Sequence, residues 1–255
     1  MTVLYEDNHI IAVNKTCNEI VQGDKTGDTP LSEIVKAYIK EKYNKPGEVF
    51  LGVTHRLDRP TSGVVLFART SKALTRLNEM LKEKSSYSVS SLTAERSNSE
   101  TVLQQSGLKK TYWAIVQGSP KVPEARLENY LVRNEKQNKS YVCKSPSLSR
   151  EGRREAPKLA VLTYRTLARG DHYTLLEVNL ETGRHHQIRC QLAAIGCPIK
   201  GDLKYGAKRS NPDGGICLHA RQIAFIHPVK KEPVTIVAPV PKEFLTIFPF
   251  LAVSE

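Results

Sequence analysis

One carboxylate stands at a predicted chain reversal whose composition suits chemistry. Asp58 lies between Arg56 and Arg59 in the run HRLDRPTSG, directly before a proline and a Thr-Ser-Gly turn that leads into an apolar segment. Neighbouring guanidinium groups favour the ionised form of a carboxyl group. An ionised and positioned aspartate can act as a nucleophile or as a base. The same spacing also suits a structural role, in which Asp58 caps the turn and pairs with an arginine.

Basic and aromatic residues from two other segments could surround such a carboxylate. Arg189 follows His185 by one turn of a helix predicted over 185–195, so the two side chains face the same way. Tyr112 lies on a predicted strand, where alternation sends it and Trp113 to opposite faces. Tyr112 therefore either joins the core or stacks on a base that has been turned out of its helix.

Metal chemistry has little support in the sequence. The tandem His185-His186 and Cys190 offer part of a ligand set, but no further ligand follows at an accepted spacing. The five cysteines are odd in number and form no CxxC pair, so we expect reduced thiols and neither a disulfide framework nor a zinc ribbon. A metal-dependent nuclease would need a cluster of carboxylates, which the sequence does not present.

Composition points to a polyanionic partner. The formal net charge is +12, which favours nucleic acid or an anionic membrane surface. No stretch approaches the roughly 18 apolar residues of a transmembrane helix, and Glu6 and Asp7 interrupt the N-terminus where a signal peptide would be basic and then apolar. The motifs GxxxxGK[ST], GxGxxG and HExxH are absent, as is HxE with PCxxC, so ATPases, dinucleotide enzymes, zinc proteases and zinc deaminases lose their usual support.

Periodicity predicts the elements that must position these residues. Apolar stripes predict helices over 31–39, 73–81 and 185–195, the last with Thr182 as a capping residue and Gly196 as its stop. Strands are predicted over 3–5, 10–13, 64–68, 111–116, 160–167, 173–180, 223–226 and 234–237. Because strands and helices do not alternate regularly, we expect an α+β fold with a mixed, largely antiparallel central sheet and flanking helices. We expect one domain over 1–255, with a polar, flexible insertion at about 85–107.

The three segments together resemble the RluA family of pseudouridine synthases, which act on large-subunit ribosomal RNA and transfer RNA. The run at 55–63 matches the family's catalytic motif without departure, 110–118 matches KxYxAxVxG, and 182–206 matches TGRxHQIR followed by GxPIxGDxxYG. The resemblance covers nearly the whole chain except the insertion. Three positions depart from it: Gln191 and Cys197, where histidine is common, and Thr16, where proline is usual.

The resemblance implies a role for each candidate residue. Asp58 would be the catalytic aspartate, Tyr112 would stack on the target uracil and assist proton removal, and Arg189 would pair with Asp58 and position it. The further substrate contacts that we expect are Arg56, which would enter the RNA near the extruded base, Leu218, which would pack beside the uracil, and His55, Arg59, Arg184 and His186.

The resemblance also implies the fold and the activity. We expect the pseudouridine synthase fold with a basic catalytic cleft, beginning at the catalytic domain without the S4 RNA-binding module of some relatives. The enzyme would be a cytoplasmic, monomeric isomerase that converts one uridine of ribosomal or transfer RNA, with no cofactor, metal or membrane partner. A catalytically silent basic RNA-binding or RNA-chaperone protein is the alternative, and it would tolerate Asp58→Asn.

Overall fold

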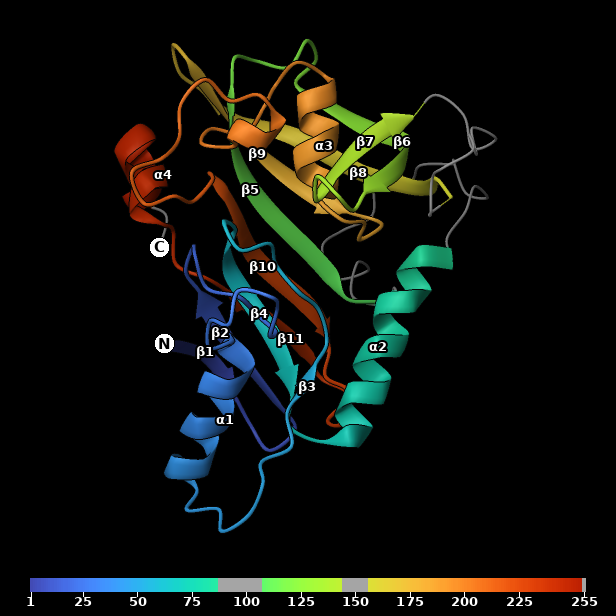
Figure 1. The fold of residues 1–255 in the computed structure, drawn as a ribbon, viewed down its shortest axis with the longest axis vertical. Coiled ribbons are helices and arrows are strands. Elements are labelled where there is room, and N and C mark those ends of the chain that lie inside the picture. The colour runs from blue at the N-terminus through green and yellow to red at the C-terminus, as the bar shows by residue number, and fades with distance from the viewer. Residues whose placement is uncertain (87–106, 144–155, 254–255) are drawn as a thin grey trace. The chain divides into compact units, whose positions relative to one another are not determined.

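The computed structural model describes residues 1–86, 107–143 and 156–253, and these form two compact units (Figure 1). The first unit comprises Met1–Lys110 and Ala220–Pro239, and the second comprises Thr111–His219 and Val240–Glu255. Most of the insertion predicted at 85–107 therefore lies outside the described residues. The single catalytic domain stays a prediction.

The first unit is built on a sheet that joins both ends of its sequence. Its strands follow the order β1-β2-β4-β10, with β3 paired to β4 and β11 paired to β10. The pairs β1–β2, β2–β4, β3–β4 and β10–β11 are all antiparallel. The strand bounds are β1 Thr2–Glu6, β2 Ile10–Lys15, β3 Gly52–Val53, β4 Ser62–Ala68, β10 Leu218–Ile226 and β11 Pro233–Val237.

Two helices complete this unit, α1 at Leu31–Lys42 and α2 at Ser71–Ser86. α2 begins after Thr70, whose hydroxyl accepts a hydrogen bond from the amide of Ala73 at 3.2 Å. Its apolar residues join those of β2, β4 and β10 in one buried cluster, in which Leu77 has no exposed surface. Every residue of Ile10–Val13 is also fully buried, so both faces of β2 are covered.

The second unit is an antiparallel sheet with the order β5-β9-β8-β6-β7. A register shift between Thr166 and Ala168 interrupts the pairing of β8 with β9. The β6–β7 hairpin was not predicted, because charged residues alternate through it and the apolar signal is weak. The strand bounds are β5 Lys109–Gln117, β6 Glu124–Asn134, β7 Lys139–Cys143, β8 Lys158–Arg169 and β9 Tyr173–Leu180.

Short helices flank this second sheet. The predicted helix over 185–195 is present as α3, Gln187–Ala194, and Gly196 ends it with a φ of +81° as expected. The predicted cap was wrong: the Thr182 hydroxyl donates to the Gln187 side chain at 2.8 Å, and no side chain caps α3. The remaining helical segments are η2 Leu203–Tyr205, α4 Lys242–Ile247 and η3 Pro249–Val253.

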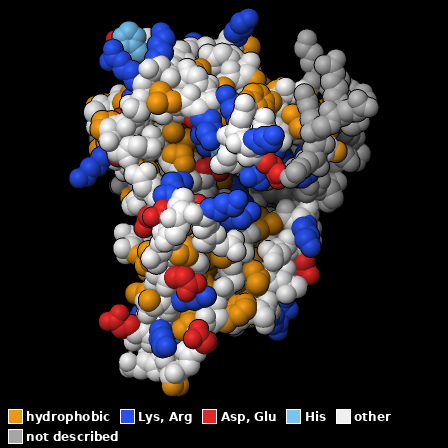
Figure 2. All heavy atoms as spheres, in the orientation of Figure 1, with side chains coloured by type: hydrophobic (Ala, Val, Ile, Leu, Met, Phe, Trp, Pro, Cys, Tyr) orange, Lys and Arg blue, Asp and Glu red, His pale blue; other side chains and the backbone are white. Residues whose placement is uncertain are grey.

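The predicted class is confirmed: the chain combines helices with a mixed, mostly antiparallel sheet, and each predicted strand is present. On the face shown in Figure 2, Lys and Arg side chains are more abundant than Asp and Glu, in keeping with the net charge of +12. Within the described residues, no helix combines the length and the apolar character needed to cross a membrane.

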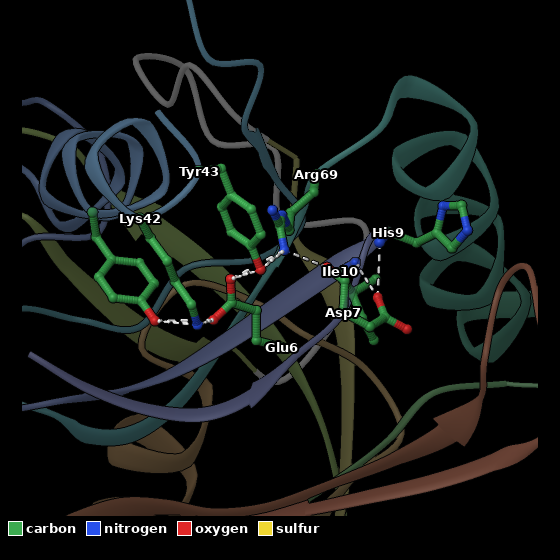
Figure 3. Close-up of polar contacts among 8 residues, drawn as sticks. Glu6, Asp7, His9, Ile10, Lys42, Tyr43 and Arg69 are labelled. Carbon is green, nitrogen blue, oxygen red and sulfur yellow. Dashed lines mark hydrogen bonds and ion pairs between the residues drawn. The ribbon is translucent and has the colours of Figure 1, made fainter. Parts of the chain in front are cut away.

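A partly buried carboxylate, that of Glu6, ties α1 to the first hairpin (Figure 3). Glu6 accepts hydrogen bonds from Lys42 at 2.7 Å, from the Tyr43 hydroxyl at 2.8 Å and from Arg69 at 3.1 Å. In the turn that follows, Asp7 accepts from the amides of His9 and Ile10, at 2.8 and 2.9 Å. These contacts close the β1–β2 turn and anchor the end of α1 beside β4, the strand that follows the Asp58 segment.

We expect Gly63→Ala to destabilise the protein by at least about 2 kcal/mol. Gly63 has a φ of +115°, and an added Cβ would lie 2.3 Å from the carbonyl oxygen of Ala220. Urea unfolding measures the loss, with Gly47→Ala as the control, because a Cβ at Gly47 meets nothing within 4 Å. Equal stability of the two variants would contradict the close approach of β4 to β10.

Candidate active site

Asp58 lies in a short turn that leads directly into β4. The amide of Thr61 donates to the Asp58 carbonyl at 3.0 Å, which closes the turn around Arg59 and Pro60. Leu57 is buried beneath the turn, the Asp58 side chain is half-buried, and Arg56 is exposed. The turn therefore holds one carboxylate at the surface of the first unit on a backbone anchored from both sides.

A buried ammonium group fixes this turn from below. Lys15 ends β2 with no exposed surface, and its Nζ donates to the carbonyls of Thr16, Arg59 and Thr61 at 3.0, 2.9 and 2.6 Å. Burial lowers the pKa of Lys15 to about 8, against the opposing influence of Glu19, Cys17 and Asp58. Lys15 was not among the predicted site residues. The available signal was a lysine at the end of a strand that begins with four apolar residues.

Arg59 has partners that the sequence did not indicate. Its guanidinium donates to Asp28 at 2.6 Å and to the Thr26 hydroxyl at 2.7 Å, so it fastens the 24–28 loop. Both members of the Arg59–Asp28 pair are substantially exposed. A role of Arg59 in substrate binding stays a prediction.

His55 joins the same segment to β4, and its expected contact with substrate stays a prediction. Its Nε2 accepts the amide hydrogen of Leu66 at 3.1 Å, and Thr54 donates to the Leu66 carbonyl at 2.6 Å. These two side chains extend the pairing of β3 with β4 past the last backbone pair. Burial, and next the charge of Lys110, hold the pKa of His55 well below its usual 6.5. The imidazole is therefore neutral, and its hydrogen bond places the proton on Nδ1.

The other candidate residues belong to the second unit. Tyr112 lies in β5 opposite Val178 and is buried, which agrees with the core reading of a strand tyrosine; a stacking role stays a prediction. Leu218 opens β10 and is 4% exposed. Arg184 donates through Nε to the Leu159 carbonyl at 2.8 Å, which fixes the loop before α3.

Arg189 lies in the first turn of α3 and has a partner that the sequence did not identify. Its Nε and one terminal nitrogen donate to the two oxygens of Asp202 at 2.7 and 2.8 Å. The two side chains are 6% and 1% exposed, so this is a buried, two-pronged ion pair. Asp202 is the acidic residue of the GDxxYG run, which was the available signal. The predicted pairing of Arg189 with Asp58 stays a prediction, since the two residues belong to different units.

The two histidines before α3 belong to a hydrogen-bond network. His185 precedes the helix and stacks on His186, with ring centroids 3.8 Å apart. His185 bonds the Ser140 hydroxyl at 2.8 Å through Nδ1, and His186 bonds the Tyr205 hydroxyl at 3.1 Å. Among the described residues, no group of three His, Cys, Asp or Glu could hold a metal ion. His186 is buried within this network, and its expected contact with substrate stays a prediction.

Several known proteins are similar to this chain in sequence or in fold. A family model described as RNA pseudouridylate synthase matches residues 9–194. An uncharacterized RNA pseudouridine synthase of Synechocystis sp. is 32% identical over 257 residues, covering 98% of this chain and 69% of that protein. Ribosomal large subunit pseudouridine synthase D of Xylella fastidiosa is 32% identical over 95% of this chain and 67% of that protein.

A solved structure adds the fold itself. Human RNA pseudouridylate synthase domain containing 4 aligns with a TM-score of 0.72 at 21% identity, over 98% of this chain and 93% of that chain. The fold and the matched segments together define an enzyme that isomerises uridine within RNA. The chain belongs to the RNA pseudouridine synthase family, of the RluA type that its motifs predicted. The activity of this class is an intramolecular isomerisation.

The neutral histidines predict a loss of stability in acid. Burial first, and then the charge of Arg189, lower the pKa of His186 to about 2, whereas the usual value is 6.5. Unfolding therefore takes up a proton below pH 6.5: the stability from this group is complete above pH 6.5 and falls as the pH drops towards 2.

We expect His186→Asn to reduce the slope of the unfolding free energy against pH below 6.5 by up to about 1.4 kcal/mol per pH unit. Asparagine suits the left-handed φ of 52° at this position, so the backbone is preserved. Urea unfolding between pH 4.5 and 7.5 measures the slope. His172→Asn, in an exposed loop, is the control and should leave it unchanged. An unchanged slope in His186→Asn would mean that His186 is protonated in the folded state.

Proposed function

We propose that this chain converts one uridine of a structured RNA, ribosomal or transfer, into pseudouridine, with Asp58 as the catalytic carboxylate. The supporting observation is that hydrogen bonds fix the backbone on both sides of this carboxylate. Lys15 donates to two carbonyls of the turn, and His55 accepts from the Leu66 amide and so joins the preceding loop to β4. The large-subunit pseudouridine synthase among the relatives makes ribosomal RNA one candidate target.

The reaction makes definite demands on the protein. The N1–C1′ bond of uridine breaks, C1′ joins C5 of the same uracil, the hydrogen at C5 leaves as a proton and N1 gains one. There is no net oxidation or reduction. The uridine must be extruded from its helix, and the detached uracil must stay bound while it turns.

Each proposed residue meets one of these demands. Asp58 either adds to C1′ or removes the proton at C2′, and both roles need an ionised carboxylate beside the sugar. Tyr112 provides an aromatic platform for the base, and Leu218 adds apolar contact beside it. Arg56 is exposed next to Asp58 and suits a side chain that enters the RNA. Arg189 supplies the cation that positions Asp58.

The excess positive charge supplies affinity for the substrate. A net charge of +12 favours contacts with phosphates, which carry most of the affinity in RNA and DNA complexes without reading the sequence. Choice of the target uridine then depends on the loops around the catalytic residues. Mapping of pseudouridines in cells that lack this protein identifies the target.

We expect Asp58→Asn to abolish pseudouridine formation while RNA affinity stays within about tenfold of the original, because phosphate contacts dominate binding. Release of tritium from RNA carrying [5-³H]uridine measures turnover, and filter binding measures affinity. Asp171→Asn, in an exposed loop of the second unit, is the matched control and should remain fully active. Normal turnover in Asp58→Asn would remove Asp58 from the catalytic role. RNA binding without any tritium release by the unmodified protein would favour the alternative, a catalytically silent RNA-binding protein.

We expect Arg189→Met to lower turnover at least about a hundredfold, in the range found when an electrostatic partner of the reacting groups is removed. Arg189→Lys should recover part of the rate, since a point charge still attracts a carboxylate but lacks the planar fork. Single-turnover rates on one RNA measure the loss in each variant, and unfolding curves confirm that each variant is folded. An Arg189→Met rate close to that of the unmodified protein would place Arg189 outside the active site.

A further inference from the structure

The Arg189 guanidinium rests in a buried seat made by two side chains of one short loop. Asp202 forms the two-pronged ion pair, and the centroid of the Tyr205 ring lies 5.2 Å from the guanidinium carbon. A guanidinium offers five donor hydrogens in one plane, and the fork with Asp202 engages two of them. The fork therefore sets the plane of the group and the direction of every other donor.

The loop that carries this seat has little freedom of its own. The amides of Tyr205 and Ala207 both donate to the Asp202 carbonyl at 3.0 Å. Gly201 precedes it with a φ of +88°, and an added Cβ would lie 2.8 Å from the Asn211 side chain and from the Gly215 carbonyl. Because the backbone is fixed on both sides of Asp202, the carboxylate is held in place before any substrate binds.

Tyr205 is anchored to the edge strand of the second unit. Its hydroxyl accepts the amide hydrogen of Ser140 at 2.8 Å and lies 3.2 Å from the Ser140 carbonyl. His186 Nδ1 adds a third contact at 3.1 Å. A tyrosine with so many contacts at its hydroxyl cannot rotate away, so its ring is a fixed surface beside Arg189.

The residue before α3 adds to this constraint. His186 adopts a left-handed φ of 52°, which is uncommon for a residue other than glycine and is found where surrounding contacts enforce it. Three residues later in α3 comes Arg189. The strained start of the helix thus places both the imidazole and the guanidinium against Tyr205.

Stability alone explains this arrangement poorly. A buried ion pair gains little over apolar residues of the same volume, because desolvating two charges offsets most of their attraction. An oriented guanidinium, in contrast, can donate its remaining hydrogen bonds in fixed directions, which suits a group that must position a reacting partner. We propose that Asp202 and Tyr205 are positioning residues that fix the orientation of the Arg189 guanidinium for the isomerisation. This inference rests on the proposed function, in which Arg189 acts at the reacting uridine.

Asp202→Asn and Tyr205→Phe test the seat. Asp202→Asn keeps the shape but removes the charge, and we expect kcat to fall between about tenfold and a hundredfold while the KM for RNA stays within about threefold. Tyr205→Phe, which keeps the ring and removes the hydroxyl, should lower kcat in the same direction by less. Asp202→Glu should regain part of the rate. Glu177→Gln, which breaks the exposed pair with Arg165, is the matched control and should change neither constant.

A combined variant separates positioning from a general loss of structure. If Asp202 acts through Arg189, then Asp202→Asn added to Arg189→Met lowers kcat no further than Arg189→Met alone. The double change also removes both buried charges, so it stays informative if Asp202→Asn fails to fold by itself. An additional loss in the double variant would overturn the inference, as would a folded Asp202→Asn with unchanged kcat.

The proposed function and this inference fail in different ways. Absence of tritium release from the unmodified protein, or full activity of Asp58→Asn, would overturn the proposed function. If the unmodified protein is active, Asp58→Asn is inactive, and Asp202→Asn and Tyr205→Phe keep full activity, then only the positioning role of Asp202 and Tyr205 is overturned.

Discussion

The candidate catalytic turn depends on one buried ammonium group. Lys15 is fully enclosed, and its Nζ donates to the neutral carbonyls of Thr16, Arg59 and Thr61. Enclosing an ammonium costs solvation energy, which is why its pKa falls to about 8. The cost is tolerated because three carbonyls of two separate segments converge on one point. The turn that carries Asp58 is therefore tied to the end of β2.

The second unit solves the same physical problem with a different partner. Arg189 is also buried, but a carboxylate compensates its charge, and an aromatic ring stands beside it. A carboxylate fork defines direction as well as charge, whereas three carbonyls around an ammonium define only position. The two cations therefore suit different tasks: Lys15 holds backbone, and Arg189 presents a planar group in a set direction.

The local patterns predicted most of the fold and the candidate residues but not their partners. Apolar runs such as Ile10–Val13 predicted strands correctly. The β6–β7 hairpin was not predicted, because charged residues alternate with its apolar ones. Thr182 was wrongly expected to cap α3, since its hydroxyl meets the side chain of Gln187. The Arg59 guanidinium donates to Asp28, a partner 31 residues away in the sequence that no local pattern predicted. Periodicity reports which face is buried, but a polar partner across the fold leaves no periodic trace.

The strand β10 gives the chain a particular problem during synthesis. The first unit needs Ala220–Pro239 to complete its sheet, although its other part ends at Lys110. At 5–20 residues per second, a ribosome needs on the order of ten seconds to bridge that interval. Throughout that time β4 can pair with β2 but lacks β10 on its other side, and an unpaired edge of a largely apolar strand is prone to aggregate. The growing chain therefore has reason to depend on chaperones until Ala220–Pro239 emerges.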